Sequence, residues 1–566
     1  MDKRTVAAIV LIGLIIILYP WYLRLLGLAP VTSPEKEEVV SQEEAVREKE
    51  QVFIPKEEPA KALTPVREAE QRELIIESPF FRGTIDTKGA LLASWEIKPR
   101  FRSPQEQEWV RLLPTFLEEG ALGISFPVAG SIADVNELIF ESERDSLVLS
   151  ASHQEDSLRL SVETAEGIRV LKEFSFNYMS HSIGMRLKIE GAGDLGDGRQ
   201  YTLWWRPGLR PTEKKLKDDL SAFAAYTMLG DEVVKSKFGA GQVIKDSSFT
   251  GNASWLAIQT KYFLMAMIPP GDVNGLGVKI KGLHEKEDQA EDQEEKRIIS
   301  AGMHMPLHEG ACDHHWEIYL GPIDYFVLKE YHLGLERIVN LGFRYIRWIG
   351  LLILQFFVTL HRVIPNYGVV IVLFSIVIKI LFYPLTRKSF ESMEKMREIQ
   401  PKISELREKY KSDPAKLNKA TIELYRKYKI NPASGCFPML LQMPVFIALY
   451  AVFRNTIELR GETFLWIKDL SAPDTVFYLP IALPLYGNAF NILPIIMAIT
   501  MFLQQKASMK DPKQAYMVYL MPIFLFFLFN GFSSGLVLYW TLFNLLTLLQ
   551  EQIRHRHKAA IVSTDD

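Results

Sequence analysis

The chain has 566 residues, of which 65 are Lys or Arg and 68 are Asp or Glu, so its net charge is -3. This near balance excludes a strongly basic nucleic-acid-binding protein. Hydrophobic residues make up 48% of the chain, and they gather toward its two ends, whereas residues 31–340 have the composition of a soluble segment. The pattern predicts a membrane protein with one large domain exposed to water.

The small number of cysteines and the absence of several short motifs exclude several kinds of enzyme chemistry. Cys312 and Cys436 are too few for a disulfide framework, and we expect them on opposite sides of the membrane. The sequence contains no Walker loop, dinucleotide fingerprint, Gly-x-Ser-x-Gly elbow or paired zinc-ligand spacing. We therefore expect a protein that is not an enzyme and uses no cofactor.

The N-terminal segment 1–30 resembles either a cleaved signal peptide or a retained anchor. Basic residues precede the apolar run 6–18, which ends in an aromatic cluster at 19–22. Pro30 directly follows the best small-x-small site and disfavours cleavage there, and the aromatic cluster fits the end of a retained helix. We interpret 1–30 as a signal anchor whose N-terminus is cytoplasmic, and the Glu-, Lys- and Pro-rich segment 31–72 as a disordered linker.

Residues 73–325 have the pattern of an all-β domain. Short β-branched and aromatic runs recur between turn-forming residues, and the apolar residues alternate with period two at 183–189. We predict a β-sandwich with one or two short helices, and a solvated loop at the charged segment 282–297. The expected strands lie at 74–77, 83–86, 147–151, 158–162, 169–176, 182–189 and 255–268.

One stretch of this domain is rich in potential metal ligands: His304, His308, Cys312, His314 and His315. Such ligands suit zinc or copper. Their spacing matches no standard site, and Pro306 and Gly310 would break a helix that aligned the first two histidines. We expect scattered histidines on a sheet edge and no bound metal.

The positions of the basic residues predict how many segments cross the membrane. Segment 344–362 is apolar on one face, but its uninterrupted apolar part is too short to span about 30 Å of hydrocarbon. If it did cross, the next apolar run would place the basic loop 386–435 outside, against the positive-inside rule. We therefore predict an outer connector at 326–366 that contains an amphipathic helix lying on the membrane interface.

The same rule gives an α-helical membrane core at 367–555. Its five spans are expected at about 369–385, 437–453, 491–505, 516–532 and 536–550. With the anchor the total is six spans, both termini are cytoplasmic, and 556–566 forms a cytoplasmic tail. Two spans hold only about fifteen residues and cover about 22 Å, so the bilayer should thin there or water should enter.

A basic helical hairpin is expected at 387–430, between the first two core spans. Ser412 or Asp413 should cap its second helix, with Pro414 in the first turn and a kink at Pro401. Its charges could be an ordinary solvated surface, or they could meet lipid headgroups, ribosomal RNA or a nascent chain.

Lys379 is the most unusual residue of the expected spans, because an ammonium near mid-bilayer costs about 2.5–3.5 kcal/mol. It could extend toward the inner interface. Alternatively, it could share a wet cavity with polar residues of other spans, namely Gln442, Thr500, Gln504, Thr541, Asn544 and Thr547. The later expected spans contain no acidic residue, so we expect an external anion to be the partner of Lys379.

Several motifs support a more specific interpretation. They include Tyr383-Pro384-Leu385-Thr386, Gln400-Pro401-Lys402, Asn431-Pro432, Gly435-Cys436-Phe437-Pro438, Gln442-Met443-Pro444, Phe464-Leu465-Trp466-Ile467 and Gly535-Leu536-Val537-Leu538-Tyr539-Trp540. Together, across 344–555, these motifs closely resemble the YidC/Oxa/Alb family of membrane protein insertases. The anchor and the large domain resemble the Gram-negative YidC form, whose periplasmic domain is a β-supersandwich similar to sugar-mutarotase folds.

The resemblance implies an inner-membrane insertase and chaperone that accepts hydrophobic segments, alone or beside the Sec translocon. It implies a hydrophilic groove lined by Lys379, Gln442, Thr500, Gln504, Thr541 and Asn544. The family's groove usually carries an arginine, and Lys379 keeps the charge but loses the bidentate fork.

The implied partners are newly made membrane proteins, the Sec translocon, the phospholipid bilayer and the ribosome. Because the tail after Gln550 is short, ribosome contact is expected at the hairpin, through Met393, Met396, Lys402, Arg407 and Lys409.

Two other functions are compatible with parts of the sequence. A solute transporter could use Lys379 as an anion site, but it would be expected to show internal repeats and discontinuous helices. A carbohydrate-active enzyme on a membrane stalk would need a carboxylate and a histidine converging in a sugar cleft.

Overall fold

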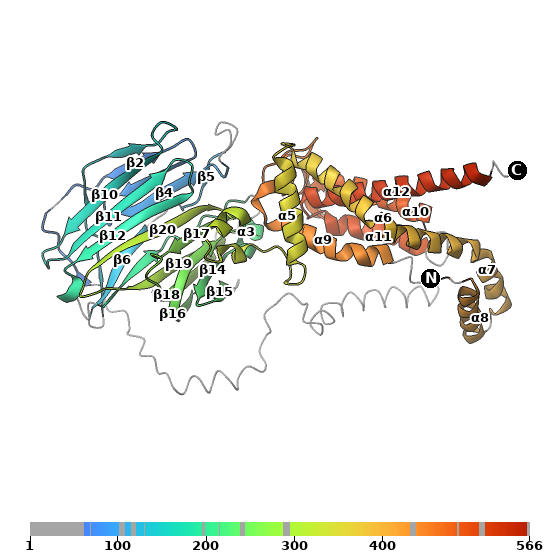
Figure 1. Cartoon of the computed structure of the whole chain (residues 1–566), viewed down its shortest axis with the longest axis horizontal. Helices are drawn as coiled ribbons and strands as arrows, with labels where there is room; N and C mark the ends of the chain where they lie inside the picture. Colours follow the sequence, from blue (N-terminus) through green and yellow to red (C-terminus); the bar gives the residue numbers. More distant parts are fainter. Residues whose placement is uncertain are drawn as a thin grey trace. The chain divides into compact units, whose positions relative to one another are not determined.

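The computed structural model describes residues 61–67, 69–100, 108–114, 120–128, 131–194, 199–213, 216–237, 244–286, 295–411, 413–428, 430, 437–483, 486–508 and 515–562. The expected anchor, most of the linker and Cys436 lie outside these residues. Lys61–Val128 and Ala133–Asp566 belong to one compact unit. Within this unit a β-rich domain precedes a helical core (Figure 1).

Twenty described strands form the β-rich domain, as the sequence predicted for an all-β domain. They are β1 Lys61–Ala62, β2 Glu73–Glu77, β3 Phe81–Asp86, β4 Leu91–Ile97, β5 Val110–Arg111, β6 Ala121–Val128, β7 Ser131–Asp134, β8 Glu141–Ser142, β9 Ser146–Val148, β10 Glu155–Glu163, β11 Arg169–Asn177, β12 Ser182–Glu190, β13 Gln200–Trp205, β14 Ala224–Leu229, β15 Glu232–Lys237, β16 Ile244–Gln259, β17 Phe263–Ile268, β18 Gly275–Lys286, β19 Glu295–Pro306 and β20 Cys312–Pro322. The short helices η2 Ala192–Asp194 and α3 Leu216–Ala222 interrupt them.

Most strand pairs are antiparallel, and β16 changes partners along its length. Its first part pairs with β18, and after an irregularity between Thr250 and Ala253 its second part lies between β14 and β17. Strand β12 pairs with β11 and β20, and its apolar residues are buried at every second position, as the two-residue period predicted. One large apolar cluster, which includes Trp95, Trp205 and Phe174, fills the domain.

Three local expectations differ from the structure. The run 255–268 contains two strands, β16 and β17, joined by a turn at 260–262. Residues 282–286 and 295–297 belong to the paired strands β18 and β19 and not to a loop, because the cross-strand hydrogen bonds continue through the charged residues. The end of the expected linker is also ordered: β1 pairs in parallel with β7, and Leu63 is buried.

The helices follow in chain order. They are α4 Tyr325–Glu330, η3 Leu335–Ile338, α5 Arg347–His361, α6 Tyr367–Glu398, α7 Gln400–Lys409, α8 Pro414–Lys427, α9 Phe437–Asn455, η5 Ile457–Leu459, α10 Leu493–Ser508, α11 Ala515–Phe529 and α12 Ser534–Val562. Between η5 and α10, β21 Thr475–Leu483 and β22 Gly487–Asn491 form a two-stranded ribbon that the sequence analysis did not predict.

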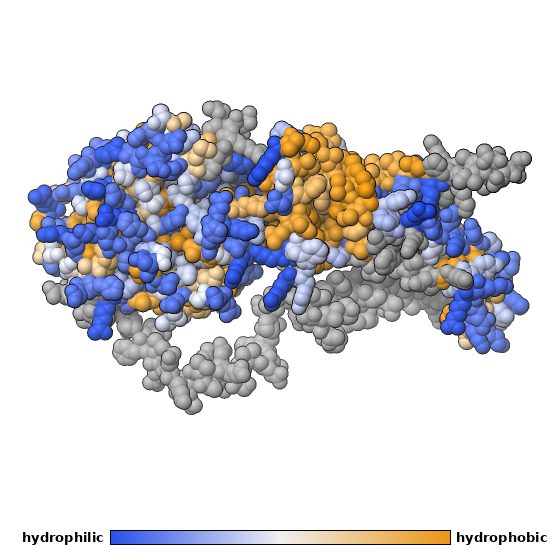
Figure 2. All heavy atoms as spheres, in the orientation of Figure 1, coloured by the Kyte–Doolittle hydropathy of each residue, from blue (hydrophilic) through white to orange (hydrophobic). Residues whose placement is uncertain are grey.

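A second apolar cluster joins α5, α6, α9, α10 and α12 to strands β14, β16 and β17. Hydrophobic residues gather over the helices, whereas hydrophilic residues cover most of the visible sheet surface (Figure 2). Among the described residues, α6 is the one helix long and apolar enough to cross a membrane alone, over Tyr367–Pro384. Shorter apolar helices lie at Arg347–His361, Leu493–Ala507 and Val518–Phe529.

The expected hairpin begins inside a longer helix. Helix α6 continues without a break from the apolar segment to Glu398, so 387–398 extends the predicted span as one rigid helix. The chain then bends at Ile399, with Pro401 in the first turn of α7, where proline is tolerated. The Asp413 side chain accepts a hydrogen bond from the Lys416 backbone N–H and caps α8, as predicted.

Candidate functional site

The ammonium of Lys379 lies between helices α6 and α12. Its Nζ donates a hydrogen bond to Thr547 Oγ1 at 2.7 Å, and it lies 4.8 Å from the centre of the Phe543 ring. Thr547 is one helical turn after Phe543, whose carbonyl oxygen accepts a hydrogen bond from the threonine hydroxyl. Among the described residues, the partners of this half-buried lysine are therefore a hydroxyl and an aromatic face, both without charge.

A second contact connects α9 to α12. The Gln442 amide donates a hydrogen bond to the Tyr539 hydroxyl, and both side chains are buried. The Tyr539 ring lies 6.2 Å from the Phe543 ring, which in turn faces Lys379. Tyr539, Phe543 and Thr547 recur every four residues, so one face of α12 contacts both Gln442 and Lys379.

The other predicted groove residues do not enter this set of contacts. The hydroxyls of Thr541 and Thr500 donate to carbonyls of their own helices, Val537 O and Met497 O. Gln504 is half-buried on α10. The structure thus brings Lys379 and Gln442 onto one face of α12, whereas the two threonines are satisfied locally.

Helices α10 and α12 contain several buried polar atoms that have no hydrogen-bond partner among the described residues. Asn544 Nδ2, Gln505 Oε1, Gln550 Oε1 and Trp540 Nε1 are buried without a hydrogen-bond partner among the described residues. A buried polar group without a partner costs about 1–3 kcal/mol, so water or a ligand is expected to reach such atoms. Their presence agrees with a polar interior between these helices.

The hairpin residues have distinct environments. Met396 packs against a small cluster of buried isoleucines, Ile399, Ile403 and Ile430. The Lys402 ammonium bonds to the Tyr428 hydroxyl and so joins α7 to the end of α8. Arg407 is half-buried and Lys409 is exposed. The side chain of Met393, on α6, lies outside the described ones.

Sequence reasoning missed three features of this core. Phe543 is a direct partner of Lys379, and its four-residue offset from Thr547 was the available signal. Glu551 is buried on α12, one position beyond the predicted span. Arg554 forms an ion pair with Glu394 at 3.6 Å, and this pair connects the polar C-terminal part of α6 to α12.

Comparison with known proteins decides the family. Residues 73–355 match the model of the YidC periplasmic domain, and residues 359–560 match that of the 60Kd inner membrane protein. The chain is 32% identical to the membrane protein insertase YidC of Prosthecochloris aestuarii over 100% of its length and 96% of that protein. It is 31% identical to that of Chlorobium phaeovibrioides over 97% and 94% of the two chains.

The chain belongs to the YidC family of membrane protein insertases. This confirms the predicted function of membrane protein insertion, and the relatives are named as insertases and not as enzymes. A solved structure of an active YidC insertase with its first transmembrane domain resolved covers 87% of this chain and 94% of its own, at 18% identity and a TM-score of 0.37.

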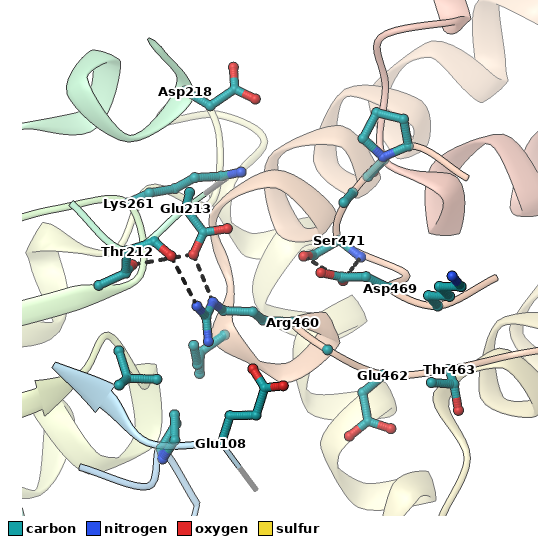
Figure 3. Close-up of a pocket in the computed structure, with 18 of the residues that line it drawn as sticks. Glu108, Thr212, Glu213, Asp218, Lys261, Arg460, Glu462, Thr463, Asp469 and Ser471 are labelled. Carbon is teal, nitrogen blue, oxygen red and sulfur yellow. Dashed lines mark hydrogen bonds and ion pairs between the residues drawn. The ribbon is translucent and has the colours of Figure 1, made fainter. Parts of the chain in front are cut away.

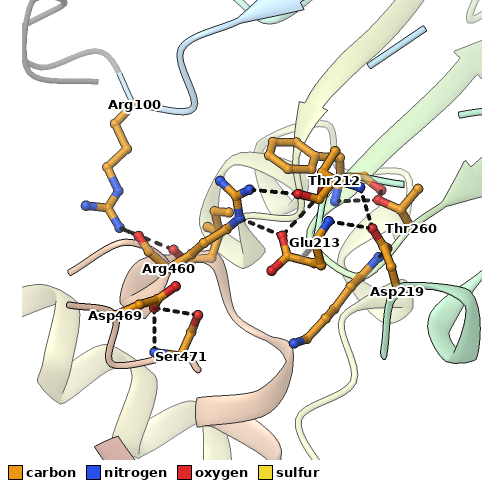
Figure 4. A network of polar contacts seen from close by, with 11 residues as sticks. Arg100, Thr212, Glu213, Asp219, Thr260, Arg460, Asp469 and Ser471 are labelled. Carbon is orange, nitrogen blue, oxygen red and sulfur yellow. Dashed lines mark hydrogen bonds and ion pairs between the residues drawn. The ribbon is translucent and has the colours of Figure 1, made fainter. Parts of the chain in front are cut away.

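A polar junction connects the YidC periplasmic domain of this chain to the loop between α9 and β21 of the helical core. Arg460 Nε donates to Glu213 Oε1 at 2.7 Å, and its guanidinium faces the Phe263 ring at 5.4 Å. Arg100 pairs with Glu462 and donates to the Glu458 backbone carbonyl at 2.7 Å. Figure 3 shows Arg460 reaching Glu213 from the loop, and Figure 4 shows Arg100 on the other side of the same loop.

This junction borders a cavity of about 1380 Å³. Basic and acidic side chains both line it, among them Arg111, Lys261, Asp218 and Asp469. Asp219 holds the sheet side in place, because its carboxylate accepts hydrogen bonds from the backbone N–H groups of Thr212, Glu213 and Lys261 (Figure 4). No local sequence pattern indicates this site, since its residues are separated by up to about 360 positions.

Burial strongly affects the titration of Glu458, a carboxyl group at this junction. Its side chain is 7% exposed, and burial together with the nearby charge of Asp324 raises the pKa of Glu458 to about 7. Its Oε2 has no partner among the described residues. The ionised form of this carboxyl is therefore disfavoured where the domain meets the core.

The histidine-rich stretch is distributed along two strands and a turn. His304 Nδ1 bonds with Thr202 Oγ1 at 2.8 Å, and buried His314 bonds with the Tyr201 hydroxyl at 2.8 Å. His315 is exposed, whereas the Cys312 thiol is half-buried. Among the described residues, no group of three or more His, Cys, Asp or Glu side chains is arranged to hold a metal ion.

Proposed function

We propose that this YidC-family insertase uses Lys379 to hold acidic residues that flank a hydrophobic segment during its passage into the bilayer. One observation carries the proposal: the ammonium is fixed by a neutral hydroxyl and an aromatic ring. Of its three N–H groups, one has a protein acceptor among the described residues. The site thus keeps an uncompensated positive charge and free donors for a carboxylate.

The pairing must be weak enough to release the segment. At 4 Å and an effective dielectric constant of about 20, a carboxylate gains about 4 kcal/mol before desolvation. About 1–2 kcal/mol remains after both groups lose water. A polar groove formed with Gln442, Asn544, Thr500, Gln504 and Thr541 would supply the hydration that keeps this balance.

The test is a series of single-span substrates that differ only in the charge of their outgoing tails. Lys379→Ala should slow insertion of acidic tails about tenfold, the equivalent of about 1.4 kcal/mol, and should leave Asn/Gln tails almost unaffected. Lys379→Arg should work at least as well as the original. Lys395→Ala, at an exposed position of the same helix, is the control. Equal slowing of acidic and neutral tails would exclude charge capture.

The proposed topology has six spans, cytoplasmic termini, and a periplasmic domain of β-supersandwich type at 73–325. It is supported by the basic residues of the hairpin and by the interfacial character of α5, which exposes Trp348 and Leu352 on the same face as Gln355 and Thr359. Cysteines placed at the exposed positions Lys411 and Lys468 test it. A membrane-impermeant reagent should label position 468 and not 411 in intact cells, and labelling of 411 would refute the topology.

Cooperation with the Sec translocon and with ribosomes is the second part of the proposal. The basic surface of α7 and α8 supports ribosome contact, because such contacts depend on phosphate neutralisation. Arg407→Ala with Lys409→Ala should weaken co-sedimentation with ribosomes that carry a stalled substrate, whereas Glu405→Gln with Glu408→Gln on the same helix should not. Crosslinking from 442 and 544 to such a nascent chain, with and without the translocon, tests the Sec contact.

A further inference from the structure

The ribbon β21–β22 exposes an apolar surface outside the insertase groove. Residues 475–491 contain no Asp, Glu, Lys, Arg or His. On β21, Tyr478 is 67% exposed and Ile481 is 72% exposed, and Val476 and Phe477 are also exposed. An isolated two-stranded ribbon is only marginally stable in water, and an exposed apolar patch of this kind indicates an interaction surface.

The base of the ribbon is held firmly by buried polar contacts. The Asn491 amide donates to the Asn530 backbone carbonyl at 2.6 Å, just beyond the end of α11. In return, the Asn530 amide donates to the Tyr486 carbonyl at 2.9 Å. Asp474 accepts a hydrogen bond from the Leu493 N–H at 2.7 Å and so fixes the start of α10. The ribbon therefore has a defined position relative to two membrane helices.

Near its turn, the ribbon lies against the apolar side of α11. The Tyr486 ring stacks on Phe526 at 5.5 Å and meets Phe527 edge-on at 6.3 Å. Phe526 precedes the last residue of α11 by three positions, which corresponds to about 5 Å along the helix. If α11 spans the bilayer, a ribbon at this end of the helix would lie near the boundary between headgroups and acyl chains.

The exposed surface of the ribbon continues the exposed apolar surface of α11. That helix exposes Leu520, Ile523, Phe524, Phe527 and Leu528, which in a membrane insertase face acyl chains. Tyrosine, as at 478, is enriched where a membrane meets water. The absence of charge and the continuity with α11 both favour lipid as the material that covers the ribbon.

We propose that β21–β22 is a lipid-binding ribbon that inserts its exposed apolar side chains into the phospholipid leaflet beside α11. By resting on the lipid, it would hold the adjoining ends of α10 and α11 at a constant depth. The proposal requires that α11 lies in the bilayer, but it does not depend on the role of Lys379 or on which side each terminus lies.

The test uses the full chain, with Cys312→Ser and Cys436→Ser, in nanodiscs of phosphatidylethanolamine and phosphatidylglycerol. Tyr478→Cys and Ile481→Cys each receive an environment-sensitive nitrobenzoxadiazole dye. Both positions are exposed, so the substitutions leave packing intact. Lys468→Cys, at an exposed position before the ribbon, is the matched aqueous control. Lipids with a spin label near the headgroup end of the acyl chain quench buried dyes, and iodide quenches dyes in water.

Dyes at 478 and 481 should lose most of their fluorescence to the spin-labelled lipid and be protected from iodide, and the dye at 468 should behave in the opposite way. In addition, Ile481→Asp should restore iodide quenching at 478, whereas Ile481→Leu should not. Iodide quenching at 478 and 481 as strong as at 468 would overturn the proposal. Protection from both quenchers would also overturn it, because the ribbon would then be covered by protein.

Discussion

A fully buried lysine in the periplasmic domain and a half-buried lysine in the helical core distinguish these two regions. In the sheet domain, the Lys172 side chain is fully buried and donates to three backbone carbonyls, those of Gly89, Ala90 and Leu122, at 2.7–3.1 Å. All three acceptor residues have positive φ angles. In the core, the Lys379 ammonium has one hydroxyl acceptor and one aromatic neighbour among the described residues.

The difference separates a lysine whose acceptors the fold supplies from one that, under the proposed function, stays available for a carboxylate. Three acceptors match the three donors of an ammonium, so Lys172 needs no ligand. At Ala90 and Leu122 it also stabilises left-handed backbone, which costs a residue other than glycine about 1–2 kcal/mol. The Lys379 ammonium has an acceptor for one of its three donors among the described residues, and a carboxylate could accept from the other two. Burial of a lysine alone therefore does not indicate function; the number of acceptors that the fold supplies does.

The largest expected effect is on the sheet domain. Lys172→Met should destabilise it by about 4 kcal/mol, because three buried carbonyls lose a charged donor at about 1–3 kcal/mol each, with partial relaxation. Pulse proteolysis of the full chain in urea, read from fragments of 73–325, measures this. Lys188→Met, at a half-buried position on the neighbouring strand β12 where the lysine pairs with Glu190, should change stability by less than about 1 kcal/mol. A loss equal to that of the control would contradict the structural role of Lys172.

The two regions should respond to pH in opposite directions. Burial lowers the pKa of His181, in the sheet domain, to about 4. The unfolded state then binds more protons between pH 4 and 6.5, so this contribution to stability is lost as the pH falls through that window, by about 3 kcal/mol. Burial raises the pKa of Glu458 to about 7. The folded state then binds more protons, so stability is lost by a similar amount as the pH rises from 4.5 to 7.

Hydrogen exchange of the full chain against pH separates these two contributions. With rates corrected for intrinsic amide exchange, peptides from β12 should lose protection as the pH falls from 6.5 to 4, and peptides containing η5 should lose protection as the pH rises from 4.5 to 7. His181→Gln should remove only the first of these pH dependences, and Glu458→Gln only the second. If either variant removed both pH dependences, the two titrations would not be independent.

A smaller effect of opposite sign is expected when the same substitution is made in the core. Lys379→Met loses one neutral acceptor, about 1 kcal/mol, but also removes the cost of an ammonium in the bilayer, about 2.5–3.5 kcal/mol. The core should keep its stability or gain about 1–2 kcal/mol, measured by the same proteolysis read from fragments of 367–555. Destabilisation as large as that of Lys172→Met would make Lys379 a structural residue.

The smallest effect concerns the junction between the two regions. A double-mutant cycle with Arg460→Ala and Glu213→Ala should give a coupling of about 1–2 kcal/mol, since the pair is largely shielded from water. Exchange of peptides containing η5 is the readout. The more exposed pair Arg144 and Asp156 should couple by less than about 1 kcal/mol. Equal coupling in both pairs would mean that the junction adds no rigidity.

Local patterns in the sequence were enough to predict many features. The alternation at 183–189 predicted strand β12, Asp413 and Pro414 predicted the start of α8, and the cost of a charge in an apolar run singled out Lys379. Short motifs sufficed for the family, because they combine turn residues, prolines and aromatic residues at fixed spacing. These signals are local, since each depends on residues within a few turns or one strand.

The partners of these residues were decided by the tertiary structure alone. That Lys379 meets Thr547 and Phe543, 164 to 168 positions away, depends on how α6 packs on α12. That Arg460 reaches Glu213 depends on where the loop between α9 and β21 contacts the sheet domain. The charged residues at 282–297 led to a predicted loop where the structure has parts of two paired strands. The prediction was wrong because cross-strand hydrogen bonds do not depend on side-chain polarity. Composition and period determine elements, whereas contacts between distant segments depend on packing, which no local pattern in one sequence encodes.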